Sequence, residues 1–382
     1  EETMRYLKPD FYDEFSCLAG ACPKTCCAGW QIVIDETSLD KYEGLSGPFG
    51  NRIRNSIDWD EEIFFQYGSR CAFLNEEDLC EIQKELGESY LCDTCKMYPR
   101  HVEEYEGLRE YSLSLSCPKA AEMILENQKK VTFSEWETEE EEEFESFDFL
   151  MFTQLEDARD ILYTITQNRD LNFEKRAWMC AEPAKAMQEA VDENQFFEID
   201  ALLEQYRNQD IKLLCKKYKI EAPHARYARM KREIRVLQEE LEHLESAWSV
   251  TLENLAELLY QDGEENYCRI YEEFQKGVGA KSDKKQEWEI QKEQLMMFFV
   301  YTYFCGAVYD DAIWSKMALS LFSVEWITEL WMYQWISEKK IEWLKWRQRG
   351  NKKQEEGFIE RCRNQNSRNQ KNDFQRSGTY GL

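Results

Sequence analysis

The sequence predicts a mainly α-helical protein whose N-terminal third is a small, irregular α+β domain rich in cysteine. Nine of the 14 cysteines lie within the first 117 of 382 residues. From Phe149 onward apolar residues recur with helical spacing, and the only prolines are Pro183 and Pro223. An acidic run from Ser134 to Asp148, with nine carboxylates and no basic residue, separates the two parts. We therefore divide the chain into a cysteine-rich metal or iron-sulfur domain, an acidic linker or helix start, a helical domain and a basic, poorly ordered tail: residues 1–130, 131–148, 149–349 and 350–382.

Composition indicates a globular protein with acidic character. A hydrophobic fraction of 43% over 382 residues suffices for real cores without covalent cross-links. The net charge of -27 would repel phosphate backbones and anionic membranes, so we expect no nucleic-acid partner and a basic or lysine-rich protein partner. No window reaches the roughly 18 apolar residues of a transmembrane segment. The longest apolar stretch, Leu295 to Val308, fits a buried core helix.

The first residues lack the basic start, apolar stretch and cleavage site of a secretory signal. We therefore expect a cytoplasmic protein. Thiols stay reduced in that compartment, so a cysteine cluster there favours metal or redox chemistry over disulfides.

Short strands and loops are expected to surround the cysteines. Gln31 to Ile34 is strand-like, and Asp35 or Thr37 is placed to cap the helix that follows. An apolar helical pattern begins after Cys117 and leads out of the domain. Three further segments resemble strands: Ile63–Tyr67, Cys71–Leu74 and Leu108–Leu115.

Two features of the helical part predict packing within the chain. Five apolar residues follow the 3-4 spacing of a coiled-coil seam: Ile234, Leu237, Leu241, Leu244 and Trp248. This seam is short, which favours a helix hairpin over a dimer zipper. Residues 314–346 contain six tryptophans, which we expect mostly in the core and between helices.

The cysteine spacing predicts a metal site. Cys92 and Cys95 form a C-x2-C clamp, in which two intervening residues let both thiolates face one centre. Cys26 and Cys27 are adjacent, and neighbouring side chains diverge, so they suit different irons of a cluster better than one zinc. Thiolates suit iron-sulfur centres as readily as zinc, and a zinc site that only holds the domain together is the structural alternative. The candidate ligands are Cys17, Cys22, Cys26, Cys27, Cys71, Cys80, Cys92, Cys95 and Cys117.

Other catalytic signatures are missing. His101 is the only histidine in the cysteine domain, and we interpret it as an ordinary loop residue. The sequence contains no phosphate loop and no G-x-S-x-G motif. It also has no doubly wound S-adenosylmethionine fold with a glycine-rich first turn and no C-x3-C-x2-C triplet of radical S-adenosylmethionine enzymes. No catalytic residue can be named from the sequence.

The chain resembles the flagellin lysine N-methylase family in three blocks of sequence, which follow one another in this order: LKPDFYDEFSCLAGACPKTCCAGWQIVID, RCAFLNEEDLCEIQKELGESYLCDTCKMYPR and LSLSCPKAAEMIL. That family shares its cysteine pattern with CxxCxxCC zinc- or iron-chelating domains, from which the C-x4-C-x3-C-C spacing here departs. The resemblance covers residues 6–125 closely. It implies S-adenosylmethionine-dependent methylation of surface lysines of flagellin, or of another lysine-rich protein, with a [4Fe-4S] cluster.

The resemblance also suggests how the cysteines would serve the donor. Three cysteines would leave one iron free for the amino and carboxylate groups of S-adenosylmethionine, whereas four would close the cluster for a structural or redox role. Tyr98 and Arg100 follow the C-x2-C, where the arginine would bind a carboxylate or else satisfy loop carbonyls. A zinc- or iron-binding interaction module without catalytic activity is the alternative function.

Overall fold

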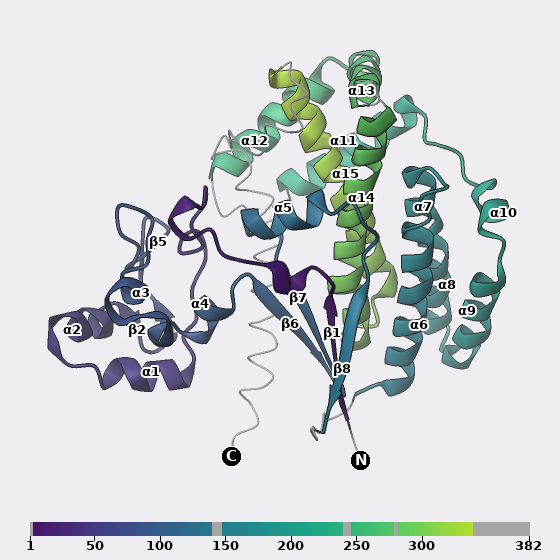
Figure 1. Cartoon of the computed structure of the whole chain (residues 1–382). Coiled ribbons are helices and arrows are strands. Elements are labelled where there is room, and N and C mark those ends of the chain that lie inside the picture. The colour runs from purple at the N-terminus through teal and green to yellow at the C-terminus, as the bar shows by residue number, and fades with distance from the viewer. Residues whose placement is uncertain (1–2, 140–146, 240–245, 279–281, 339–382) are drawn as a thin grey trace.

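The computed structural model describes residues 3–139, 147–239, 246–278 and 282–338 (Figure 1). The strands are β1 (Met4–Pro9), β2 (Ile57–Asp58), β3 (Ile63–Phe64), β4 (Gln66–Tyr67), β5 (Arg70–Cys71), β6 (Arg100–Tyr105), β7 (Leu108–Leu113) and β8 (Phe133–Thr138). The α-helices of the N-terminal region are α1 (Glu36–Glu43), α2 (Gly47–Asn55), α3 (Glu81–Leu86), α4 (Asp93–Met97) and α5 (Pro118–Glu126). Those that follow are α6 (Phe149–Thr166), α7 (Phe173–Met179), α8 (Ala181–Asp192), α9 (Ile199–Asn208), α10 (Ile211–Cys215), α11 (Pro223–Glu239), α12 (Ser246–Ala256), α13 (Glu264–Val278), α14 (Ser282–Tyr303) and α15 (Ile313–Glu338).

These elements confirm the predicted fold class, which is mainly helical with a small α+β region at the N-terminus. The predicted basic tail, residues 350–382, lies outside the described residues. No described helix combines the length and apolar character needed to cross a bilayer.

A four-stranded sheet joins distant parts of the chain. Its order is β6-β7-β1-β8, with β1 parallel to β7 and antiparallel to β8. Strand β8 comes from the segment that the sequence predicted as an acidic linker or helix start, so that expectation is wrong for Phe133–Thr138. The reason is aromatic packing: Phe133 lies on Tyr301, at 4.8 Å between ring centroids, and Trp136 stacks on Tyr6 at 5.1 Å. Residues 140–146 of the acidic run lie outside the described part.

The end of the acidic run does begin a helix, as expected. Asp148 caps α6, because its side chain accepts a hydrogen bond of 2.9 Å from the backbone N–H of Met151.

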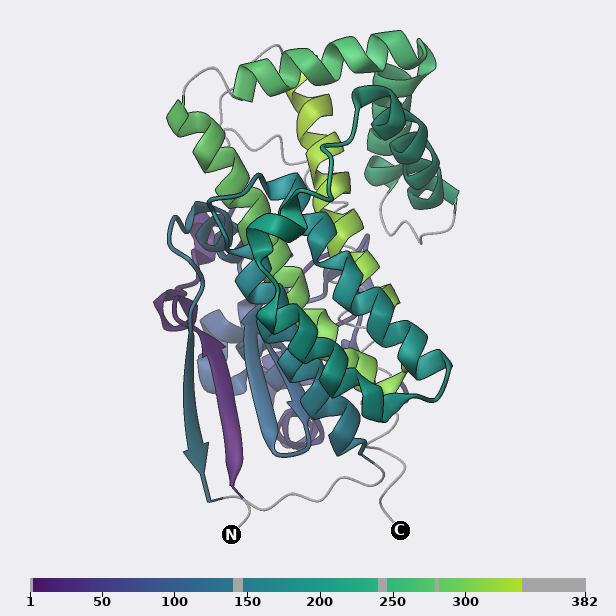
Figure 2. The same ribbon diagram turned by 90° about the vertical axis from the view of Figure 1, so that its right-hand side faces the viewer.

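One face of the sheet packs against the helices, which Figure 2 shows stacked beside it. Tyr105 and Leu108 of the sheet share a hydrophobic cluster with Leu155 of α6. Glu110 of β7 accepts a hydrogen bond of 2.7 Å from the guanidinium of Arg159 on α6, and both side chains are buried. The sheet and the helices therefore share one core.

A second, separate core belongs to a small unit built from α1–α4 and β2–β5, which we call the cysteine subdomain. It lies to one side of the sheet in Figure 1. Its fully buried apolar residues include Ile32, Tyr42, Phe64 and Phe73. Asp35 caps α1 by accepting from the backbone N–H of Ser38 at 2.9 Å, as the sequence predicted.

The strand predictions in this region are only partly correct. Gln31 to Ile34 forms no strand; it makes a single bridge between Val33 and Ile63, because only that residue finds an antiparallel partner. The predicted strand Ile63–Tyr67 forms β3 and β4, each of two residues, whereas only Cys71 of the predicted strand Cys71–Leu74 belongs to a strand, β5. Leu108–Leu115 is confirmed as β7, and the helix predicted after Cys117 is α5.

The helical part confirms the predicted burial. Leu295 to Val308 lies in α14 and the turn after it, with nearly every side chain buried. Ile234 and Leu237 of α11 share one cluster with Trp248 of α12, which confirms that these helices pack within the chain. Leu241 and Leu244 of the predicted seam lie outside the described residues, as do Trp343 and Trp346. The described tryptophans of α15 are partly buried against the cores, as expected: Trp314, Trp326, Trp331 and Trp335.

Lys292 on α14 is a buried cation that forms no salt bridge within the described part of the chain. Its Nζ lies 5.0 Å from the ring centroid of Phe173 and 5.1 Å from that of Trp288. Burial lowers the pKa of Lys292, and the charge of Arg226 acts in the same direction. Three carboxylates nearby act in the opposite direction: Glu174, Glu289 and Glu325.

Replacing Lys292 with methionine is expected to stabilise the protein by about 1 kcal/mol at neutral pH, or about 2 °C in Tm. Because the folded-state pKa is lowered, the unfolded chain binds more protons between that pKa and the ordinary value of about 10.4. Wild-type stability therefore rises with pH in that window, and the advantage of Lys292→Met should shrink there. Thermal unfolding between neutral and alkaline pH measures this, with Lys276→Met, an exposed lysine of α13, as control. A loss of stability in Lys292→Met at neutral pH would contradict the assignment.

Candidate metal centre

Five of the predicted cysteine ligands lie together in the cysteine subdomain. Cys71 and Cys92 belong to its buried core, and Cys27, Cys80 and Cys95 pack against that core. The Cys27 side chain is hydrogen-bonded to those of Cys26 and Cys80. The side chains of Cys92 and Cys95 are hydrogen-bonded to each other. None of the described cysteines forms a disulfide.

Backbone contacts place these sulfurs. The backbone N–H of Cys71 donates to the carbonyl of Cys27 at 2.8 Å, which holds the adjacent-cysteine loop against β5. Cys80 precedes α3 and forms a bridge with Leu74. Cys92 precedes α4, whose Asp93 N–H donates to Asp35 at 2.9 Å. Residues far apart in sequence are thus fixed around one small core.

The thiol pairs hold their protons unequally. The hydrogen bond from Cys27 lowers the pKa of Cys80 to about 6, and the pKa of Cys27 is raised by its hydrogen bonds with Cys26 and Cys80. Likewise the hydrogen bond with Cys95 lowers the pKa of Cys92 and raises that of Cys95. These shifts favour loss of the proton from Cys80 before Cys27 and from Cys92 before Cys95. Thiolates are the form that binds metal, and metal binding would release the remaining protons.

The other predicted cysteines lie toward the sheet. Cys117, at the start of α5, is buried with Tyr12 and Phe15. It interacts electrostatically with Cys22 and Cys17. Cys17 is exposed, and the half-buried Cys22 thiol donates to the carbonyl of Lys24 at 2.7 Å. Cys26 interacts with Cys22 as well as with Cys27, so it lies between the two sets.

The chemical type of these ligands, cysteine sulfur, suits a thiolate-bound metal or an iron-sulfur cluster. These residues are soft sulfur donors, and five of them gather around one small core. As these side chains lie, no three cysteine, histidine or acidic residues among the described ones are arranged to hold one ion. Metal loading would therefore require the thiol pairs to converge by side-chain rotation.

Tyr98 and Arg100 lie between the cysteine subdomain and the sheet. The Tyr98 hydroxyl is 3.0 Å from Ser116 Oγ, and its ring lies 5.9 Å from that of Trp30. Arg100, the first residue of β6, lies over the ring of Phe15 at 5.1 Å. Among the described residues, no carboxylate pairs with the Arg100 guanidinium. A half-buried arginine without a carboxylate is suited to bind an external one.

His101 is buried in β6, not in a loop as the sequence suggested, because β6 begins directly after the Tyr98–Pro99 bond. Its Nε2 lies 2.6 Å from Glu103 Oε1.

Sequence reasoning missed the aromatic side chains around Arg100. Tyr12 and Phe15 pack beside Cys117, and the Trp30 indole N–H donates to the carbonyl of Cys26 at 2.7 Å. The sequence did contain a signal for them, because the aromatic residues Phe15 and Trp30 flank the first cysteine block at its two ends. Only the fold shows that both ends meet near Arg100.

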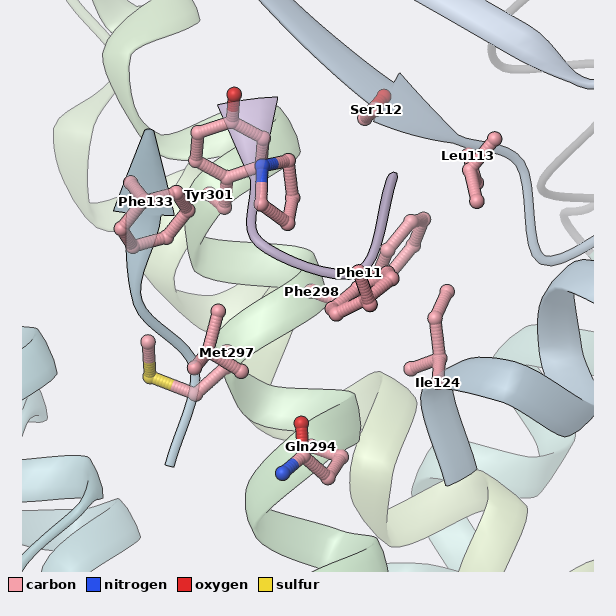
Figure 3. Close-up of a pocket in the computed structure, with 11 residues that line it drawn as sticks. Phe11, Ser112, Leu113, Ile124, Phe133, Gln294, Met297, Phe298 and Tyr301 are labelled. Atoms are coloured by element: carbon pink, nitrogen blue, oxygen red, sulfur yellow. The ribbon is translucent and has the colours of Figure 1, made fainter. Parts of the chain in front are cut away.

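A pocket between the sheet and α14 is too small for a nucleoside-sized ligand (Figure 3). Its cavity volume is about 20 Å³, which holds about one water molecule. Phe133, Phe298 and Tyr301 line it, and Gln294 contributes a polar side chain. This pocket therefore does not accommodate a methyl donor.

Comparison with known proteins gives consistent matches. Residues 159–345 match the family described as FliB lysine N-methylase C-terminal domain. The lysine-N-methylases of Salmonella typhimurium and Salmonella choleraesuis are each 33% identical over 137 residues, covering 34% of this chain and 34% of theirs. The chain thus matches about a third of the length of these two relatives. The flagellar biosynthetic protein FliU of Salmonella muenchen is 32% identical over 137 residues, which is 81% of its length. No solved structure matches the chain.

Proposed function

Because the chain belongs to the flagellin lysine N-methylase family, we propose that it methylates lysine side chains of flagellin with S-adenosylmethionine as the methyl donor. The observation that carries this proposal is the match to FliU and to the FliB lysine N-methylase C-terminal domain. The cysteines and Arg100 support a metal-dependent site for the donor in this proposal. We place the reaction in the cytoplasm, where the thiols would stay reduced.

Methyl transfer sets chemical demands that the site must meet. The lone pair of a neutral lysine amine attacks the methyl carbon, the methyl–sulfur bond breaks, and S-adenosylhomocysteine leaves with the bonding electrons. The attacking amine then loses a proton. A lysine ordinarily has a pKa of about 10.4, so the site must remove its first proton by desolvation or by a nearby base. Aromatic rings such as Tyr12 and Trp30 would favour entry of the lysine side chain.

Cysteine thiolates would hold the iron-sulfur cluster, with zinc as the alternative metal. When bound, a cluster with an open iron supplies a coordination position for the amino and carboxylate groups of the donor. In our proposal Arg100 binds that carboxylate and Tyr98 packs against the donor. The chain's charge of -27 would attract a lysine-bearing surface, so association should weaken as salt increases.

Arg100→Met is expected to weaken S-adenosylmethionine binding about 10- to 100-fold, because one hydrogen bond between charged groups contributes about 1.5–3 kcal/mol. Binding to the metal-replete protein, followed by calorimetry, measures the effect. Arg109→Met is the matched control, since Arg109 lies on the neighbouring strand β7 and pairs with Glu104 at 3.6 Å. Equal affinity of Arg100→Met and wild type, with unchanged thermal stability, would remove Arg100 from the donor site.

A methylation assay tests the function itself. Anaerobically purified, metal-replete protein is incubated with cognate flagellin and S-adenosylmethionine, and intact-mass and peptide mass spectrometry detect added methyl groups. We expect methylated lysines only when both enzyme and donor are present. If cluster-replete protein never modifies flagellin but binds it stoichiometrically, the chain is a metal-binding interaction module instead.

A further inference from the structure

We propose that the face of the sheet opposite the helices binds lysine side chains of the protein substrate on an aromatic platform made by Tyr6, Tyr111 and Trp136. The inference deepens the proposed function, on which it rests for the identity of the protein that carries the lysines. The partner is a lysine-bearing segment of that protein, bound through its ammonium groups. The platform is a docking surface next to the Arg100 site and takes no part in methyl transfer.

The three rings of the platform come from three neighbouring strands, β7, β1 and β8. Tyr6 lies directly opposite Trp136 in the antiparallel pair of β1 and β8. The ring centroids are 5.1 Å apart for Tyr6 and Trp136, 6.0 Å for Tyr111 and Trp136, and 6.3 Å for Tyr6 and Tyr111. The ring planes are inclined to one another by at most 20°. The rings therefore form one continuous aromatic surface across the strands.

Side-chain alternation places the platform on the face of the sheet away from the helices. On the helix side, Glu110 of β7 forms its ion pair with α6, and Leu7 of β1 packs against the shared core. Tyr111 and Tyr6 are the next residues along the strands from these two, so they point to the other face. The Trp136 side chain is 38% exposed, and Tyr6 and Tyr111 are partly exposed. Another protein can therefore reach the platform.

An ammonium group already lies on this surface. The Nζ of Lys8 is 5.0 Å from the centroid of the Trp136 ring and 2.6 Å from Oδ2 of Asp13. An aromatic ring beside a carboxylate is an arrangement that attracts a lysine cation. Because Asp13 and Trp136 are exposed, both contacts of Lys8 contribute little to stability. A lysine of the substrate can therefore replace Lys8 on the ring at small cost.

The platform is continuous with the surroundings of Arg100. The ring of Tyr12 meets that of Tyr111 edge-on, with the centroids 5.7 Å apart. Tyr12 shares a cluster with Phe15 and Cys117, and Arg100 lies over the Phe15 ring at 5.1 Å. Aromatic side chains thus connect the platform with the candidate donor site. A lysine held on the platform would keep neighbouring residues of the substrate close to that site.

Charge favours a basic partner for this surface. The chain carries a net charge of -27, and Asp13 and Glu14 are exposed in the turn that follows β1. Glu137 and Glu139, at the end of β8, are exposed as well. An apolar partner would remove water from such carboxylates without pairing them, which is costly, whereas lysines would pair them. The aromatic rings and the carboxylates together therefore fit a segment rich in lysine.

Binding of a lysine peptide to the full chain tests the platform. The probe is a fluorescent peptide of alternating lysine and glycine, its Nε-acetylated form is the ligand control, and anisotropy measures the Kd. We expect Trp136→Leu to weaken binding about 3- to 10-fold, because it removes one contact between a cation and a ring. Trp136→Phe should retain most of the affinity. Trp59→Leu is the matched control and should bind as wild type, since Trp59 is similarly exposed, at 41%, but lies in the cysteine subdomain.

Replacing Lys8 tests whether the peptide occupies the place that Lys8 holds. We expect Lys8→Met to tighten binding of the lysine peptide about threefold, because it removes an internal competitor for the Trp136 ring. The same change made in Trp136→Leu should tighten binding less, since the ring for which Lys8 competes is gone. Equal tightening in both backgrounds would mean that only the net charge matters and would contradict the platform.

Other outcomes would also overturn the proposal. These are unchanged affinity of Trp136→Leu with an intact fold by circular dichroism, and binding of the acetylated peptide as tight as that of the lysine peptide. If Trp136→Leu fails to fold, a Lys8→Met variant that binds no more tightly than wild type has the same meaning. Sedimentation of a wild-type dimer that dissociates in Trp136→Phe would assign the platform to a second copy of this chain.

These measurements need neither the methyl donor nor methyl transfer. A chain that binds the lysine peptide through Trp136 but never methylates flagellin keeps the platform and loses the proposed function. A chain that methylates flagellin equally well and binds the peptide equally tightly without the Trp136 ring keeps the function and loses the platform.

Discussion

Glu110→Leu is expected to lower the free energy of unfolding by about 3–5 kcal/mol, because it leaves the Arg159 guanidinium buried and unpaired. Arg159 is 3% exposed and Glu110 is 2% exposed, so neither charge can turn to solvent. The pair joins β7 to α6, the contact through which the sheet shares a core with the helices. Chemical denaturation followed by circular dichroism measures the loss.

The double variant Glu110→Leu/Arg159→Leu distinguishes the effect of the unpaired charge from the effect of packing leucine at this position. Burial raises the pKa of Glu110 despite the charge of Arg159, so the carboxylate is costly where it lies. Replacing both charges with apolar side chains should therefore recover most of the stability lost by Glu110→Leu. A double variant as unstable as the single one would mean that the loss comes from leucine packing and not from the unpaired charge.

Arg226→Met is expected to cost a similar amount, about 3–5 kcal/mol, in the second helical core. Arg226 of α11 donates to Glu329 of α15 at 2.8 Å and also binds Glu325. Glu329 in turn accepts from the hydroxyls of Tyr260 and Tyr267 at 2.6 and 2.9 Å. Removing the Arg226 cation deprives the buried Glu329 and the half-buried Glu325 of their shared partner and leaves Arg229 and Lys292 near Glu325, so α11 should detach from α13 and α15.

The pH dependence of this variant identifies the cause. Burial acts to raise the pKa of Glu325, but the charges of Arg226 and Arg229 lower it overall. In the wild type this stabilisation is present above the ordinary pKa of about 4.3 and is lost as pH falls through the lowered pKa. The stability gap between wild type and Arg226→Met should therefore shrink as the buried carboxylates become protonated in acid. Arg235→Met, an exposed arginine of α11, serves as control. A gap that stays constant with pH would point to lost packing alone.

Local signals predicted much of the secondary structure correctly. The cap at Asp35, the buried segment from Leu295 and the helix after Cys117 each follow from side chains within a few residues. The prediction failed at β8, because the acidic residues of that segment are typical of a solvent-exposed linker or helix start. Strand pairing with β1, which lies more than 120 residues earlier in the chain, decides that segment, and no local pattern contains this partner.

At the candidate site, too, the sequence predicted the residue types but not the contacts between distant residues. The sequence named the nine cysteines, because closely spaced thiols have few other uses in the reducing compartment that we expect, and it named Tyr98 and Arg100 because they follow the C-x2-C. It could not group them, because Cys27 meets Cys80 and Cys117 meets Cys22 only after the chain folds. It also could not show that the sheet brings strands from residues 4–9 and 100–113 against the helical core.

The sequence by itself determined the helical class, the family and the chemistry of the donors, since composition, periodicity and residue type are properties of the chain. Tertiary structure alone decided which thiols are neighbours, which arginine lacks a carboxylate partner among the described residues, and which charges are buried together. These depend on distances between residues far apart in sequence, and such distances are set by packing of the whole chain.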